Sequence, residues 1–171
     1  VGDMATEVKG TVTSAEETLA LAKALGESLF DPTVIALIGE MGSGKTTFVR
    51  GLAEGLDVAE VVNSPTYALM QRYEGRMRLD HYDAWMEGRE RAVMADGAHE
   101  LLGLDGVSVI EWADQVADFL PDGRLEIRIS VLGLSERGIH AKWIGSSPSA
   151  QAGACLHAIT TSLVPEEGAA G

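Results

Sequence analysis

The sequence is poor in cysteine, with Cys155 as the only one among 171 residues. A disulfide within the chain is therefore impossible, and a zinc site built from several cysteines is excluded. Long apolar runs are also missing, since no stretch approaches the ~18 residues of a membrane span. The first residues, Val1-Gly2-Asp3, lack the basic-then-apolar pattern of a secretory signal. These features predict a cytoplasmic protein in a reducing compartment, with no membrane partner.

Basic residues are scarce as well, because 13 lysines and arginines stand against 26 acids and give a formal net charge of −13. A chain with this charge does not attract nucleic acid or an anionic membrane through its overall field. If the chain serves a nucleic-acid process, we expect a partner to hold the nucleic acid. Hydrophobic residues make up 46 % of the sequence, so one domain with a sizeable core is expected.

The pattern of apolar residues predicts alternating helices and strands. Ser14 and Glu17 form a capping-box pattern ahead of apolar residues at helical spacing, which predicts a helix over 14–29. The run 33–38 is apolar at every position but its first, as in a strand buried inside a parallel sheet, and an amphipathic helix follows at 45–56. Further strands are expected at 68–73, 77–82, 107–110, 125–131 and 139–144, of which the first two and the last two form hairpins.

The segment from Gly39 to Thr46 matches the phosphate-loop pattern G-x-x-x-x-G-K-[ST] in full. Glycines let the backbone wrap closely, so that successive N–H groups point at phosphate oxygens. The helix that follows adds its positive N-terminal end. Lys45 can reach the β- and γ-phosphates, and the Thr46 hydroxyl can bind Mg²⁺. The pattern therefore predicts a nucleotide site with a magnesium ion.

A magnesium-nucleotide site needs a second acid, and the sequence offers two candidates. The strand 107–110 leads into Glu111, a Walker-B arrangement in which the carboxylate emerges at the carboxyl edge of the sheet. Asp83 closes the string Asp80-His81-Tyr82-Asp83 at the end of another strand. Either carboxylate could instead be a solvated strand-end or turn residue. His81 by itself is more typical of a hydrogen-bonded structural histidine than of a metal ligand.

Four blocks of the sequence follow one another in this order: 39–48, Asn63-Ser64-Pro65-Thr66-Tyr67, His81-Tyr82-Asp83 and Ile110-Glu111-Trp112. Together they resemble the bacterial TsaE (YjeE) family of small ATPases required for threonylcarbamoyladenosine modification of tRNA. The string S-P-T-Y after the phosphate loop is the most specific, because few other P-loop families carry it. The resemblance covers residues 10–144.

The resemblance implies a fold and a set of site residues. The fold is α/β, a P-loop NTPase-like mixed sheet flanked by helices, with a C-terminal β-hairpin. ATP and Mg²⁺ are the implied cofactors, with Thr46 and Glu111 as the metal-binding residues. Thr66 would lie near the γ-phosphate as a switch, and Asp83 would be a second acid at the metal or its water shell. The residues expected to be catalytic are Lys45, Thr66, Asp83 and Glu111. The residues expected to bind the nucleotide are Gly39, Glu40, Met41, Gly42, Ser43, Gly44, Lys45, Thr46, Thr47 and Trp112.

The same resemblance implies a weak, partner-stimulated ATPase that acts on the TsaD–TsaB complex to support its turnover, and that meets tRNA only through this complex. Two other functions stay open: a small-molecule kinase that uses the P-loop with Asp83, and a non-catalytic nucleotide sensor. The chain also departs from the family. Trp85 and Met86 stand where the family usually carries Tyr and Arg, so the family's basic residue is missing there, and Ala113 replaces a common proline.

The composition changes at Gly145, after which Ser, Pro, Ala and Gly dominate. We therefore expect two parts in the chain. Residues 1–144 form the P-loop ATPase domain, and residues 145–171 form a weakly ordered C-terminal tail.

Overall fold

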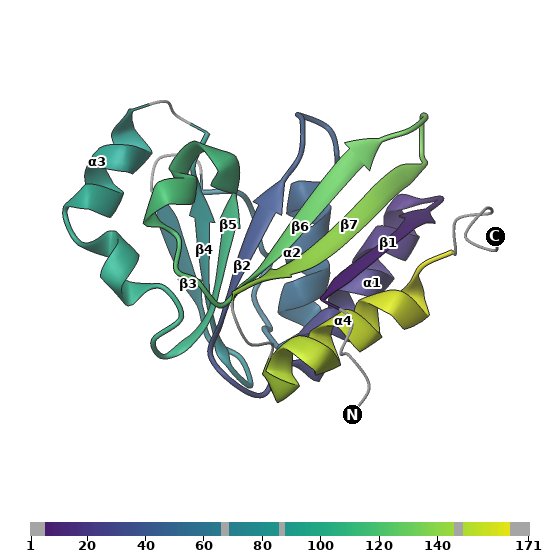
Figure 1. Cartoon of the computed structure of the whole chain (residues 1–171), viewed down its shortest axis with the longest axis horizontal. Coiled ribbons are helices and arrows are strands. Elements are labelled where there is room, and N and C mark those ends of the chain that lie inside the picture. The colour runs from purple at the N-terminus through teal and green to yellow at the C-terminus, as the bar shows by residue number, and fades with distance from the viewer. Residues whose placement is uncertain (1–5, 66–68, 86–87, 146–148, 165–171) are drawn as a thin grey trace.

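The computed structural model describes residues 6–65, 69–85, 88–145 and 149–164, and its centre is a seven-stranded mixed sheet (Figure 1). The strands are β1 (Glu7–Val12), β2 (Thr33–Ile38), β3 (Met70–Tyr73), β4 (Arg78–Asp83), β5 (Gly106–Glu111), β6 (Arg124–Val131) and β7 (Arg137–Ile144). Their order is β1-β7-β6-β2-β5-β4-β3. The central strands β6, β2, β5 and β4 run parallel, and the outer strands pair antiparallel. The predicted α/β class, the mixed sheet and the C-terminal hairpin of β6 and β7 are confirmed.

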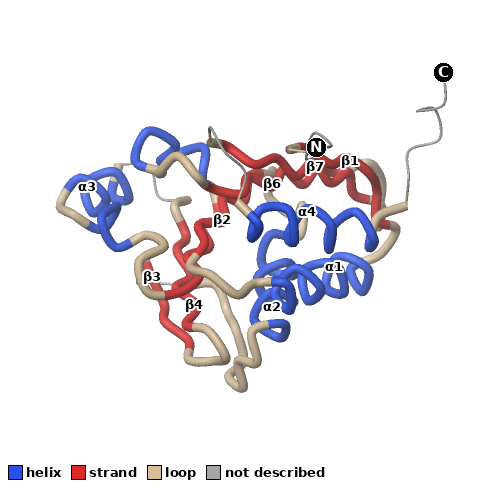
Figure 2. Tube along the Cα trace, turned by 60° about the horizontal axis from the view of Figure 1, so that its bottom comes forward, coloured by secondary structure: helices blue, strands red, loops and turns tan. Residues whose placement is uncertain are grey.

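Helices cover both faces of this sheet (Figure 2). The α-helices are α1 (Ala15–Ser28), α2 (Lys45–Gly55), α3 (Arg89–Ala95) and α4 (Ala150–Ser162), and two 3-10 helices are η1 (Ala98–Leu101) and η2 (Ala113–Phe119). On one face lie α1, α2 and α4, and α3 and η2 pack on the other. None of the described helices has the length and apolarity needed to cross a membrane.

Strand β2 is buried on both sides, as its sequence predicts. Ile35 and Leu37 point into the core beneath α1 and α2, whereas Val34 and Ala36 point into a second core beneath α3 and η2. All four side chains are at most 3 % exposed. The alternation follows from the period of two in a strand, and it fixes β2 at the middle of the sheet.

Helix α1 holds α2 in place behind the sheet. The Ser14 hydroxyl accepts the Glu17 N–H at 3.1 Å, and the Glu17 carboxylate accepts the Thr13 N–H at 2.6 Å, so the predicted N-terminal cap is present. At the crossing of the two helices, a Cβ atom on Gly51 would collide with the Leu19 carbonyl oxygen. Glycine there allows the close approach that sets the N-terminal end of α2 at the carboxyl edge of β2.

The prediction of a weakly ordered tail is wrong for residues 149–164, which contain the packed helix α4. The Ser149 hydroxyl caps α4 by accepting the Ala152 N–H at 3.2 Å, and α4 packs on α1. Cys155, Leu156 and Ile159 are buried in the main core. The Ala- and Gly-rich sequence has the composition of a linker, but its small side chains suit close packing between helices. The remainder of the predicted tail, 146–148 and 165–171, lies outside the described residues.

Truncating the chain after Gly145 is expected to lower the melting temperature by about 10 °C or more. The truncation removes α4 and uncovers the side of α1 on which Cys155, Leu156 and Ile159 are buried. Each kcal/mol of lost stability lowers Tm by about 2–4 °C in a chain of this size. Thermal unfolding followed by circular dichroism measures the change. A control chain that ends at Val164 keeps every described contact of α4. An equal Tm for the full chain, the chain that ends at Gly145 and the control would show that α4 adds nothing to the stability of the fold.

Candidate nucleotide-binding site

The phosphate loop lies between the carboxyl end of β2 and the start of α2, as the sequence predicts. Gly42 and Gly44 have backbone φ angles of 79° and 105°, which residues that carry a side chain rarely adopt. The Ser43 N–H donates to the Glu40 carbonyl oxygen at 3.1 Å and closes the loop on itself. A tight glycine turn that leads into the N-terminus of a helix is the kind of segment that cradles anions.

Lys45 is the cation of this loop and is only 5 % exposed. Its ammonium donates to the carbonyl oxygens of Gly39 at 2.6 Å and Glu40 at 3.0 Å. The same nitrogen lies 4.1 Å from the ring centre of Trp112, in a cation–π contact. Burial lowers the pKa of Lys45, while the negative charges of Glu111 and Asp83 oppose that shift. The lysine is therefore held over the loop, with Trp112 as its apolar wall.

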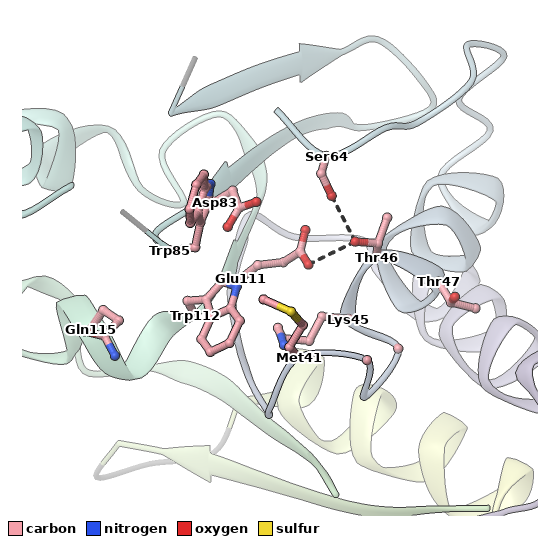
Figure 3. Close-up of a pocket in the computed structure, with 12 residues that line it drawn as sticks. Met41, Lys45, Thr46, Thr47, Ser64, Asp83, Trp85, Glu111, Trp112 and Gln115 are labelled. Carbon is pink, nitrogen blue, oxygen red and sulfur yellow. Dashed lines mark hydrogen bonds between the residues drawn. The ribbon is translucent and has the colours of Figure 1, made fainter. Parts of the chain in front are cut away.

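Thr46 and Glu111 meet at the carboxyl edge of the sheet, because β2 and β5 are parallel neighbours (Figure 3). The Thr46 hydroxyl donates to the Glu111 carboxylate at 3.2 Å and lies 2.9 Å from the Ser64 hydroxyl. Neighbouring oxygen ligands of Mg²⁺ are about 3 Å apart when each is at 2.0–2.1 Å from the ion. The oxygens of Thr46 and Glu111 have this spacing and the hard-donor chemistry that magnesium prefers, so the two residues fit the ion.

His81 holds the other oxygen of Glu111, a role that the sequence does not reveal. It is fully buried on β4, and its Nε2 lies 2.5 Å from the Glu111 carboxylate. Its Nδ1 has no hydrogen-bond partner among the described residues. Because Oε2 of Glu111 contacts His81 and Oε1 contacts Thr46, the carboxylate is fixed at both ends. The histidine is hydrogen-bonded, as its sequence favours, and the group that it positions is the predicted acid.

Asp83 is the neighbour of Glu111 on the adjacent parallel strand. Its Oδ1 is buried and has no hydrogen-bond partner among the described residues. Burial, with the repulsion of Glu111 as a second cause, raises the pKa of Asp83 to about 6. The two candidate acids therefore lie side by side, but only Glu111 touches Thr46.

Replacing Asp83 with Asn is expected to stabilise the metal-free protein at pH 7. A folded-state pKa above the unfolded one means that Asp83 favours folding when protonated, and that this contribution is lost as the pH rises from about 4 to about 6. Urea unfolding in EDTA across this pH range measures the free energy of unfolding of the variant and the wild type. The difference between the two free energies should increase with pH. Asp105→Asn is the control, because Asp105 is 73 % exposed and pairs with Arg78 at 3.7 Å. A difference that stays constant with pH would contradict the shifted pKa.

A pocket of about 760 Å³ is lined by Lys45, Thr46, Asp83, Glu111 and Trp112. Its wall includes Trp85 and Gln115, which sequence reasoning did not assign to the site, and the predicted residues Met41 and Thr47. Gly39 and Glu40 hold Lys45 from behind and do not line the pocket. Thr66 and Met86 lie outside the described residues, so the roles considered for those two positions stay untested.

The buried parallel strand, the phosphate loop and the acid on the adjacent strand place the chain among P-loop NTPase-like folds. The model of the family "Threonylcarbamoyl adenosine biosynthesis protein TsaE" matches residues 12–139. The chain therefore belongs to the TsaE family, as its sequence motifs indicate.

Individual relatives agree with this assignment. The tRNA threonylcarbamoyladenosine biosynthesis protein TsaE of Bacillus subtilis is 36 % identical over 141 residues, which cover 82 % of this chain and 88 % of that protein. The protein of the same name from Treponema pallidum is 37 % identical over 126 residues, or 74 % of this chain and 93 % of the other. The crystal structure of Bacillus subtilis YdiB superimposes with a TM-score of 0.69 at 33 % identity and covers 84 % of this chain and 90 % of that one.

Proposed function

We propose that this protein binds and hydrolyses ATP with Mg²⁺ and thereby supports threonylcarbamoyladenosine modification of tRNA. The observation that carries the proposal is the contact between Thr46 and Glu111 at the open edge of a complete phosphate loop. Family membership supports the tRNA pathway, since the related proteins are named for it.

Binding follows from the loop and its cation. The backbone turn at Gly42–Gly44 and the N-terminus of α2 attract the phosphates, and the Lys45 ammonium neutralises part of the triphosphate charge. The Ser64 hydroxyl, at the first position of the S-P-T-Y string, lies 2.9 Å from that of Thr46. A change at the γ-phosphate would therefore alter the contact of Ser64, and we propose Thr66, two positions further along the chain, as the switch residue.

Hydrolysis follows from the acids behind Thr46. When bound, Mg²⁺ would neutralise charge on the phosphates and polarise the transferred phosphoryl group. Thr46 and Glu111 would hold the ion, and His81 keeps the Glu111 carboxylate turned toward Thr46. Asp83 lines the pocket beside Glu111, where it would orient water at the metal. No nucleophilic side chain is needed, because phosphoryl transfer depends on positioning and charge.

The partner in this proposal is the TsaD–TsaB complex, which would hold the tRNA. The net charge of −13 favours docking to a basic protein surface over direct contact with tRNA. ATP turnover would reset the complex between rounds of modification. The cytoplasmic setting stays a prediction.

The test is multiple-turnover modification of tRNA by TsaD–TsaB with ATP, in the presence and absence of this protein. We expect more than one round of modification per complex only when the protein and ATP are both present. If Glu111→Gln binds ATP without hydrolysing it and still supports many rounds, the protein is a nucleotide sensor and not a functional ATPase.

A small-molecule kinase is the second candidate, and the position of Asp83 favours it. A carboxylate with a pKa of about 6 on the wall of a large pocket is suited to accept a proton from an acceptor hydroxyl. ATP consumption that rises with a metabolite and needs no protein partner would support the kinase. Consumption that rises only with TsaD–TsaB would exclude it.

A further inference from the structure

Arg137 connects the turn between β6 and β7 to the phosphate loop. It is the first residue of β7, and its side chain contacts the phosphate loop that follows β2. Its Nε donates to the Ser43 carbonyl oxygen at 3.1 Å, and Nη2 donates to the Gly42 carbonyl oxygen at 3.2 Å. These two carbonyls belong to the tightest part of the phosphate loop, between the two glycines of positive φ.

The other end of the guanidinium is held by its own turn. Nη1 donates to the carbonyl oxygens of Gly133 and Glu136, both at 3.0 Å. A cavity of about 220 Å³ lies between the turn and the loop, and Arg137 lines it. Leu134 in the turn is fully exposed, so its apolar side chain does not anchor the turn. The planar fork of an arginine is suited to join two segments in this way, and a lysine is not.

The geometry of a peptide unit gives these bonds a consequence for phosphate binding. In a trans peptide the C=O and N–H point in opposite directions. When Arg137 holds the carbonyls of Gly42 and Ser43 on its side, the N–H groups of Ser43 and Gly44 point to the opposite side. The Ser43 N–H closes the turn by donating to Glu40, and the geometry presents the Gly44 N–H to a phosphate. The guanidinium also places a positive charge behind the loop without filling the space in front of it.

We propose that Arg137 is a positioning residue that holds the phosphate loop in its anion-binding conformation. The ligand bound more tightly by the loop in this conformation is the polyphosphate of a nucleotide, so the inference rests on the proposed function. Arg137 does not touch the γ-phosphate in this role. Its loss therefore weakens nucleotide binding and leaves the chemical step of bound ATP largely unchanged.

The experiment compares Arg137→Met and Arg137→Lys with the matched control Arg128→Met. Arg128 lies on the same hairpin, is 53 % exposed and pairs with Glu126 at 3.4 Å, so its loss should have little effect. Calorimetric titration with Mg²⁺-ATP should give a dissociation constant raised about tenfold or more in Arg137→Met, which is the loss of one charge-assisted pair of hydrogen bonds. Arg137→Lys should recover only part of the affinity. In steady-state hydrolysis, KM should rise while kcat stays within about threefold.

Amide hydrogen exchange without nucleotide separates this inference from the proposed function. The Ser43 amide, which donates to Glu40, should exchange faster in Arg137→Met than in the wild type and in Arg128→Met. If the wild type binds no nucleotide, the proposed function fails, and the exchange rates still decide whether Arg137 fixes the loop.

Equal exchange and equal affinity in Arg137→Met and the wild type would overturn the inference. Full affinity in Arg137→Lys would overturn it too, because charge alone would then suffice. If Arg137→Met does not fold, the two measurements on Arg137→Lys decide.

Discussion

Glu111→Gln is expected to bind Mg²⁺-ATP within a few-fold of the wild type and to lose most of its turnover. The amide keeps the size of the buried side chain and removes the charge between Thr46 and His81. Placement of the ion matters more for the transition state than for binding, so kcat should fall by about 10²–10³-fold. Titration of ATP beside steady-state phosphate release at several Mg²⁺ concentrations measures both effects.

Asp83→Asn is the comparison for that variant, because Asp83 is the neighbouring acid on β4 and does not touch Thr46. We expect a softer loss of turnover from it. If Glu111→Gln hydrolyses ATP normally at low Mg²⁺ and Asp83→Asn does not, then Asp83 is the direct ligand and the assignment of Glu111 is wrong.

Lys45→Ala is expected to weaken ATP binding by about 10²-fold, since a charge-assisted contact to phosphate contributes roughly 2–4 kcal/mol. The ammonium is held at the loop by Gly39 and Glu40, and the ring of Trp112 lies beside it. Calorimetric titration measures the affinity, and circular dichroism checks the fold.

The control for the lysine is Lys23→Ala on α1. Lys23 pairs with Glu54 at 3.9 Å, and both side chains are about half exposed. A pair of this kind contributes little, so affinity should not change. Unchanged ATP affinity and unchanged hydrolysis in Lys45→Ala would refute the phosphate loop as the nucleotide site.

The parts of the fold with strong local signals could be predicted from the sequence. The apolar run of β2, the capping box of α1 and the full phosphate-loop pattern each depend on neighbouring residues alone. β1 is different, because it is a half-exposed edge strand that exists through its pairing with β7. Helix α4 is also different, because its Ala-rich sequence has the composition of a linker and its order depends on packing against α1.

The candidate site divides in the same way. Lys45, Thr46 and Glu111 could be named from their motifs, and the parallel pairing of β2 and β5 then brings the last two together. The roles of His81 and Arg137 could not be named, because each depends on which strands are neighbours in space. Nothing in the local sequence shows that Arg137 contacts Ser43, because the two residues are 94 positions apart in the chain.

The most direct test of the central claim is phosphate release from Mg²⁺-ATP in the presence of TsaD–TsaB, measured side by side for the wild type, Glu111→Gln and Lys45→Ala. The account predicts sustained release by the wild type and release near the level of TsaD–TsaB alone for both variants, with ATP binding kept only in Glu111→Gln. Release by both variants at the rate of the wild type would contradict the claim that this edge of the sheet is where ATP is hydrolysed.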